Sequence, residues 1–366
     1  METTPRTRPS AWPLRLVVAL ALVTFPLIWV GGLVTTYDAG MAVPDWPGTY
    51  GYNLFLYPWQ TWLAGPWDLF IEHGHRLLGA TAGILAIALV AASWRDPRKW
   101  LLPAAGGALA LVIVQGVLGG ARVLLDARLV ALLHACTGPL FFAYLAGLVA
   151  AVSQREALGA LAVEPSVRGA GLRLMRAAWW TAGLAYLQLV LGAVVRHVPL
   201  TAPAGIFRTF LLLHLLLAGG LLVQAGLTAW RAASVRAARG ALGGLRRGGL
   251  ALVLLLAVQI GLGVGTYVCK YSWPGWLTDY GFAAGHVVEE RSLTQALVTT
   301  AHVANGSLIL FVAVLLAARA TRFFRAGAGS PWKMRAVSSR TYDLAAACRT
   351  SRAAVSLEPS PLQSEP

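Results

Sequence analysis

Eight long apolar runs divide this chain, and they constrain its fold more than any other feature. The runs cover residues 14–36, 69–92, 101–121, 129–152, 175–195, 207–229, 249–268 and 294–318. A transmembrane helix needs about 20 apolar residues, and a helix satisfies its own backbone hydrogen bonds in lipid. The sequence therefore predicts an all-α integral membrane protein with eight transmembrane helices.

Composition excludes several other classes of protein. The chain is 57% hydrophobic and only 12% charged, whereas about 25% of residues are charged in soluble domains. A soluble enzyme, a disordered protein and a nucleic-acid-binding protein are thereby excluded. The first apolar run is too long for a signal-peptide core and has no clear small-x-small cleavage site before Asp38. We therefore expect it to remain as a membrane anchor.

Basic residues predict the orientation in the membrane. Most of the 30 Lys and Arg residues fall on one side, in 1–15, 95–99, 155–176, 231–247 and 319–352. Basic loops face the cytoplasm, so both termini are expected there, and the opposite helix ends are the outer ends. This bias also explains the net charge of +15 without a nucleic-acid partner. The absence of a transit peptide favours a bacterial cytoplasmic membrane.

The two halves of the chain share a repeated pattern. A Gln-x-x-Leu-Gly motif at 115–119 in the third run recurs at 259–263 in the seventh, with a further copy at 188–192 in the fifth. Repeats are common in membrane folds, and four helices per copy give a parallel repeat. We expect two pseudo-two-fold-related four-helix bundles. The predicted divisions are an N-terminal bundle at 14–152, a cytoplasmic linker at 153–174, a C-terminal bundle at 175–318 and a disordered cytoplasmic tail at 319–366.

Histidines occupy matched positions in the two halves. His75 and His134 lie near the outer ends of two parallel runs, and His214 and His302 do the same in the second half. A lone intramembrane histidine can be a hydrogen-bonded packing residue, but ionisable groups in lipid favour function. Paired imidazoles facing each other are what haem iron requires. Zinc fits less well, because no third or fourth ligand recurs. His73 is expected to face away from an iron bound at His75.

One acidic residue distinguishes the first half. Glu72 lies one turn before His75, whereas Leu211 takes the corresponding place before His214. Glu72 can pair with Arg76 as a structural ion pair at the helix start. Alternatively, it is a general base held over a ligand bound at His75. This asymmetry suggests that one site does chemistry while the other holds a redox cofactor.

Two outer loops, 37–70 and 270–292, are rich in aromatic residues. Such residues favour the membrane interface, so the loops are either an interfacial belt or a pair of lids over sites near the outer surface. His197 and His286 are expected in outer loops, in contact with solvent. Cys136, Cys269 and Cys348 imply no disulfide framework.

These motifs resemble the haem A synthase family over residues 14–318. The resemblance is carried by Gly32–Val34, Pro44–Pro47, Glu72–Arg76 and Gln115–Gly119, together with His134, His214 and His302. It implies oxidation of the C8 methyl group of haem O to a formyl group, giving haem A for terminal oxidases. It also implies a haem b cofactor between His214 and His302, and a haem O site at His75 and His134 with Glu72 as the catalytic acidic residue of the reaction. Some family members carry a cysteine pair in the first outer loop, which this chain lacks.

The expected partners follow from this resemblance. They are haem O, a haem O synthase, a membrane electron acceptor, the lipid bilayer and, as an open alternative, a second copy of the chain. Arg76, Arg122 and Arg128 are candidates to bind the haem propionates, because a guanidinium group suits a carboxylate. Two other functions fit the same pattern: a dihaem, quinol-linked cytochrome b, and a non-enzymatic haem carrier or assembly factor.

Overall fold

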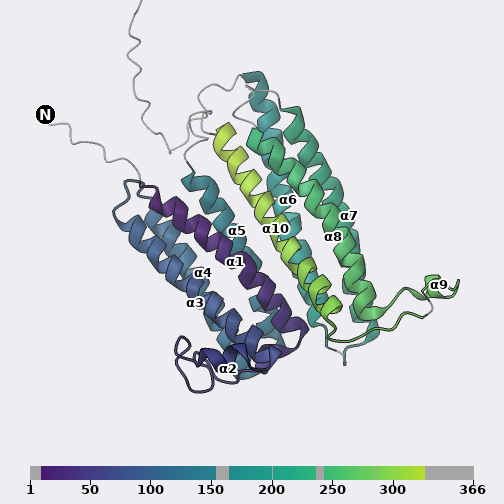
Figure 1. Ribbon diagram of the computed structural model, residues 1–366. Coiled ribbons are helices and arrows are strands. Elements are labelled where there is room, and N and C mark those ends of the chain that lie inside the picture. Colours follow the sequence, from purple (N-terminus) through teal and green to yellow (C-terminus); the bar gives the residue numbers. More distant parts are fainter. Residues whose placement is uncertain (1–9, 154–164, 200, 236–242, 284, 326–366) are drawn as a thin grey trace, which may run out of the picture. The chain divides into compact units, whose positions relative to one another are not determined.

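All regular structure in the described part of the chain is helical (Figure 1). The computed structural model describes residues 10–153, 165–199, 201–235, 243–283 and 285–325. The eight long helices are α1 (Trp12–Thr36), α3 (Trp67–Trp94), α4 (Leu101–Leu125), α5 (Arg128–Val152), α6 (Pro165–His197), α7 (Ala204–Ser234), α8 (Gly243–Tyr271) and α10 (Leu293–Arg325). Three short helical segments, η1 (Ala39–Met41), α2 (Trp59–Leu63) and α9 (Gly275–Thr278), lie in the loops.

The eight predicted spans are confirmed, because each long helix is long and apolar enough to cross a membrane. Their bounds differ from the predicted ones at the ends. Helix α6 begins at Pro165, inside the predicted linker 153–174, and α10 continues to Arg325, inside the predicted tail 319–366. A helix can continue past the hydrocarbon core into polar residues, so apolar length underestimates it. Residues 154–164 and 326–366 lie outside the described part of the chain.

The helices pack in two groups within one unit, Met1–Gly327. In the first group α1 packs on α3 and α5, and α4 packs on α3 and α5; in the second, α6, α7, α8 and α10 form a similar ring. Each group has its own apolar core. Helix α10 also packs on α1 and α5, and the Phe142 and Phe311 rings stack with centroids 4.4 Å apart. This arrangement is compatible with the predicted two-fold relation.

The first outer loop is folded against the outer end of α3. The Trp62 ring stacks on Phe70, with centroids 5.6 Å apart, and its indole N–H donates to the Phe70 carbonyl at 3.0 Å. The loop after α8 also contains a ring contact, between Trp273 and Phe282 with centroids 4.9 Å apart, and leaves Tyr280 89% exposed. Both aromatic loops therefore combine packed rings with exposed aromatic side chains, since Trp59 in the first loop is 63% exposed.

Candidate functional site

The predicted histidine pairs come together in both helix groups. His75 on α3 faces His134 on α5, with ring centroids 6.4 Å apart and ring planes at 84°. His214 on α7 faces His302 on α10, again with centroids 6.4 Å apart and with planes at 65°. In all four rings Nδ1 is buried and makes no hydrogen bond to any of the described residues. Each pair therefore brings two imidazoles from two helices to face each other.

The spacing of each pair suits two imidazoles bound to opposite sides of one metal ion. A metal–imidazole bond is about 2.0–2.1 Å long, so two such bonds in line plus the half-width of each ring give about 6 Å between centroids. The observed 6.4 Å matches this requirement. Among the described residues, no group of three or more His, Cys, Asp or Glu could hold a metal ion. Two imidazoles without a third protein ligand would suit a haem, whose macrocycle would supply the remaining ligands.

A glycine on the neighbouring helix backs every one of these histidines. A Cβ atom added at Gly31, Gly119, Gly192 or Gly263 would lie 2.8, 3.3, 3.0 or 3.1 Å from Cε1 of the facing imidazole. Contacts this short are rare for a real Cβ, so glycine at these positions lets each ring lie close to the neighbouring backbone. The rings are thus fixed between two helices. The Gln-x-x-Leu-Gly motif ends on three of these glycines, and sequence reasoning did not find this role for them.

The glutamines of the same motif hold the histidine-bearing helices. The Gln259 side-chain amide donates to the His302 carbonyl at 3.0 Å, and Gln188 donates to the His214 carbonyl at 3.0 Å. Gln188 also donates to Nε2 of His214 at 3.1 Å, so a metal taking that nitrogen requires the amide to turn away. Gln115 donates to Thr137, one turn beyond His134. Next to His75, the corresponding position of α1 is occupied by Leu27.

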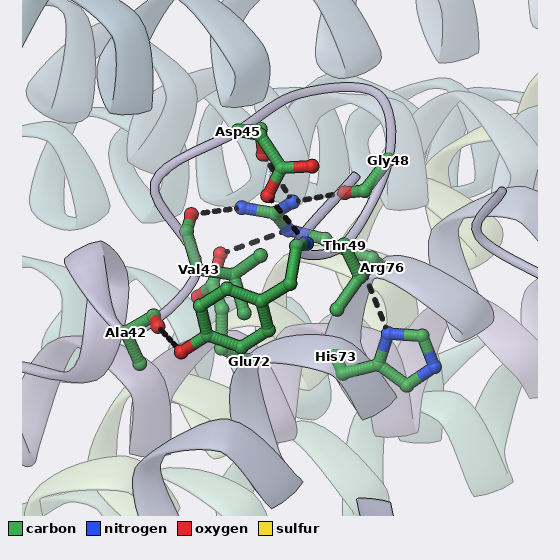
Figure 2. Close-up of polar contacts among 9 residues, drawn as sticks. Ala42, Val43, Asp45, Gly48, Thr49, Glu72, His73 and Arg76 are labelled. Atoms are coloured by element: carbon green, nitrogen blue, oxygen red, sulfur yellow. Dashed lines mark hydrogen bonds and ion pairs between the residues drawn. The ribbon is translucent and has the colours of Figure 1, made fainter. Parts of the chain in front are cut away.

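Glu72 and Arg76 form the predicted ion pair, and Figure 2 shows what else they contact. Arg76 Nε donates to Glu72 Oε1 at 3.1 Å. Its remaining nitrogens donate to the carbonyls of Val43, Asp45 and Gly48 at 2.6–2.7 Å. Arg76 therefore fastens the first outer loop to α3 by three hydrogen bonds, and its fourth joins it to Glu72 on α3 itself. The other carboxylate oxygen, Glu72 Oε2, is buried and has no partner among the described residues.

Asp45 organises the same loop from within. Its carboxylate accepts the amide N–H groups of Tyr50 and Gly51 at 2.8 and 2.9 Å. Partial burial alone would raise the pKa of Asp45, but these two hydrogen bonds, aided by the Arg76 charge, hold that pKa below its ordinary value. The loop therefore keeps an ionised carboxylate at neutral pH. The sequence identified Pro44–Pro47 as a motif, but it did not reveal that Asp45 accepts hydrogen bonds from the loop backbone.

The other histidines are placed as follows. His73 is buried, and its Nδ1 lies 2.9 Å from Thr49 Oγ1 (Figure 2). Its ring packs against Tyr57 and Trp62, so it faces the first outer loop rather than His134, as predicted. The prediction for His197 was wrong, because it ends α6 and its Nδ1 lies 2.8 Å from the Ala193 carbonyl. His286 lies in the second outer loop, as predicted, with Nε2 3.4 Å from the Val268 carbonyl.

Fold and site together define a multi-pass, all-helical membrane protein with two bis-histidine sites. Residues 66–202 match a family described as cytochrome oxidase assembly protein, COX15-CtaA. The matched stretch contains Glu72, His75 and His134. A curated protein of Symbiobacterium thermophilum, named Heme A synthase, is 30% identical over 181 residues, which is 48% of this chain and 56% of that protein. The chain thus spans just over half the length of this relative. These matches confirm the resemblance to the haem A synthase family.

Proposed function

We propose that this protein is a haem A synthase, which oxidises the C8 methyl group of haem O to a formyl group. The observation that carries the proposal is the pairing of equally spaced histidines in both helix groups, with a buried carboxylate beside only one pair. The named relative and the family match support the same activity. The proposed location is the bacterial cytoplasmic membrane. The distribution of Lys and Arg supports an orientation with both termini inside. The two helix groups are proposed to be related by a pseudo-two-fold axis.

The two pairs have different tasks in this proposal. His214 and His302 hold a permanent haem b, which supplies a one-electron carrier when bound. His75 and His134 hold the substrate, haem O, which enters from the outer leaflet because its farnesyl chain is lipid-soluble. A haem O synthase fits as the donor of that substrate, and a membrane electron acceptor fits as the oxidant.

Glu72 is the proposed general base. Conversion of a methyl to a formyl group removes four electrons and four protons and adds one oxygen atom from water. The protons need an acceptor close to the ring, and Glu72 Oε2 is a buried carboxylate oxygen that has no hydrogen-bond partner among the described residues. Arg76 holds the other oxygen at 3.1 Å and thereby fixes the carboxylate. A positioned general base contributes about 10²–10⁴-fold to a rate.

The test is production of a formyl haem in a host that makes haem O but lacks its own haem A synthase. Cells with this chain should contain haem A in their extracted pigments. Glu72→Gln should reduce the rate of haem A formation by about 10²-fold or more, while the resident haem is retained. Asp68→Asn is the matched control, since Asp68 is an exposed carboxylate in the first turn of the same helix. A normal rate in Glu72→Gln would make Glu72 a structural residue.

A second function has one specific observation in its favour. The equal spacing of the two pairs is also what a dihaem, quinol-linked cytochrome b requires. Such a protein binds two haems permanently and has no need of Glu72. Haem O recovered unchanged from the same host, with two haems per purified chain, would favour that function over ours. Haem O recovered unchanged with one haem or none would favour a carrier.

A further inference from the structure

Arg122 lies at the outer end of the first histidine pair. It follows Gly119 on α4 by three residues and therefore shares a face with it. Gly119 is the residue that backs the His134 ring, at 3.3 Å from an added Cβ to Cε1. At a rise of 1.5 Å per residue, Arg122 lies about 4.5 Å nearer the outer end than this contact. The positive charge of Arg122 also interacts electrostatically with Glu72, His75 and His134.

The guanidinium of Arg122 is held in place by packing rather than by hydrogen bonds. A Cβ added at Gly40 would lie 1.5 Å from Arg122 Nη2, so the guanidinium lies directly on the Gly40 backbone. Within the described part of the chain, Arg122 makes no hydrogen bond or ion pair. Two other arginines near the histidine pairs differ from Arg122 in this respect. Arg76 donates to four protein acceptors, and Arg196, in the last turn of α6, donates to Gly32 O and Thr36 Oγ1.

A half-buried guanidinium that is positioned but not paired is suited to an anionic ligand. Removal of a charge from water is costly unless a counter-charge compensates it. The planar fork of arginine matches a carboxylate. A porphyrin held between His75 and His134 carries two carboxylates on its edge. The predicted contact of Arg76 with such a carboxylate stays a prediction, but its donors already have protein acceptors, which makes Arg122 the better candidate.

We propose that Arg122 binds a propionate of the porphyrin held between His75 and His134, with Gly40 providing the space for its guanidinium. This inference rests on the proposed function and assigns the carboxylate contact of its substrate site. It orients the porphyrin with its carboxylates toward the outer end of the helices, where they can remain hydrated.

The test compares a porphyrin that has free propionates with one that does not. Haemin and haemin dimethyl ester are titrated into the purified full-length chain that already carries its resident haem, and bis-histidine binding is followed in the visible spectrum. His75→Ala should abolish the titratable signal, which assigns it to this site. Wild type should bind haemin about 10-fold or more tightly than the ester, because a hydrogen bond to a charged group is lost with the ester.

Arg122→Gln should remove this preference by weakening haemin binding to the level of the ester. Arg122→Lys should keep part of it, and Gly40→Ala should reduce it. Arg291→Gln is the control, an exposed arginine of the second outer loop, and should leave the preference unchanged. The resident haem spectrum reports that each variant is folded. A preference that survives in Arg122→Gln, or equal weakening of both probes, overturns this inference and leaves the proposed function standing. Failure of both probes to bind wild type overturns both.

Discussion

The two histidine pairs share their ring spacing but differ in what surrounds them. Both have centroids 6.4 Å apart and a glycine behind each ring. The second pair has glutamines that hold both of its helices. The first pair has Leu27 in one of these places, a buried Glu72 and a folded loop. In the proposed function, the shared features hold the two haems, and the differences serve the chemistry on the exchangeable one.

The largest expected effect tests directly whether the two histidine pairs have separate tasks. His214→Ala and His302→Ala should each remove nearly all of the resident haem from the purified protein, because a bis-histidine site loses an axial ligand. His75→Ala and His134→Ala should leave that haem in place. Haem per polypeptide, measured as the pyridine haemochrome, decides between these outcomes. Equal losses from all four variants would mean that the pairs do not have separate tasks.

A second variant addresses the loop that only the first pair possesses. Arg76→Met removes the donor to three loop carbonyls and leaves Glu72 buried and unpaired. Breaking a buried pair costs about 3–5 kcal/mol, so we expect faster proteolysis of residues 37–66 and a lower midpoint of thermal unfolding. Arg291→Met is the control, since the Arg291–Asp38 pair at 3.2 Å is exposed and such pairs contribute about 0–1 kcal/mol. Similar losses in both variants would show that the loop is held by something other than Arg76.

Sequence reasoning recovered the spans and the histidine pairs for the same physical reason. Apolar length is a local property that lipid imposes on each helix separately, and matched histidines repeat with the helices that carry them. The His75 and His134 contact follows from two parallel helices packed in one group. The ends of α6 and α10 were misplaced because a helix does not stop where its apolar residues stop.

The contacts that build the site could not be predicted in the same way. Arg76 donates hydrogen bonds to backbone carbonyls about thirty residues earlier in the chain. Every residue has a backbone carbonyl, so the sequence does not show which ones will accept a hydrogen bond from Arg76. The role of Gly31 depends on a ring from another helix, at 2.8 Å from an added Cβ. The other three glycines that contact a histidine ring each follow a glutamine by four residues, and this spacing is a signal that could have identified them. Gly31 lacks the signal, because Leu27 takes the place of the glutamine.

A smaller effect is expected from the glycines that both pairs share. Gly263→Ala and Gly119→Ala would press a methyl group onto His302 and His134, and overpacking of this kind costs about 1–3 kcal/mol. We expect weaker haem retention and a shifted low-spin signal in electron paramagnetic resonance. Gly261→Ala and Gly116→Ala on the same helices are the controls, since nothing lies within 4 Å of an added Cβ at either. Variants indistinguishable from their controls would show that the rings can move without consequence.

The smallest effect concerns Leu27, the one position where the first pair lacks the glutamine of the others. A net hydrogen bond contributes about 0.5–1.5 kcal/mol, so Leu27→Gln should slow dissociation of a porphyrin from the first pair by about 2- to 10-fold. Gln259→Leu should accelerate loss of the resident haem by a similar factor, because the His302 carbonyl loses its donor. Transfer of haem to excess apomyoglobin measures both rates. If the glutamine only packs against its neighbours, neither dissociation rate will change. If it holds the histidine-bearing helix, the two substitutions will make the dissociation rates of the two sites more similar.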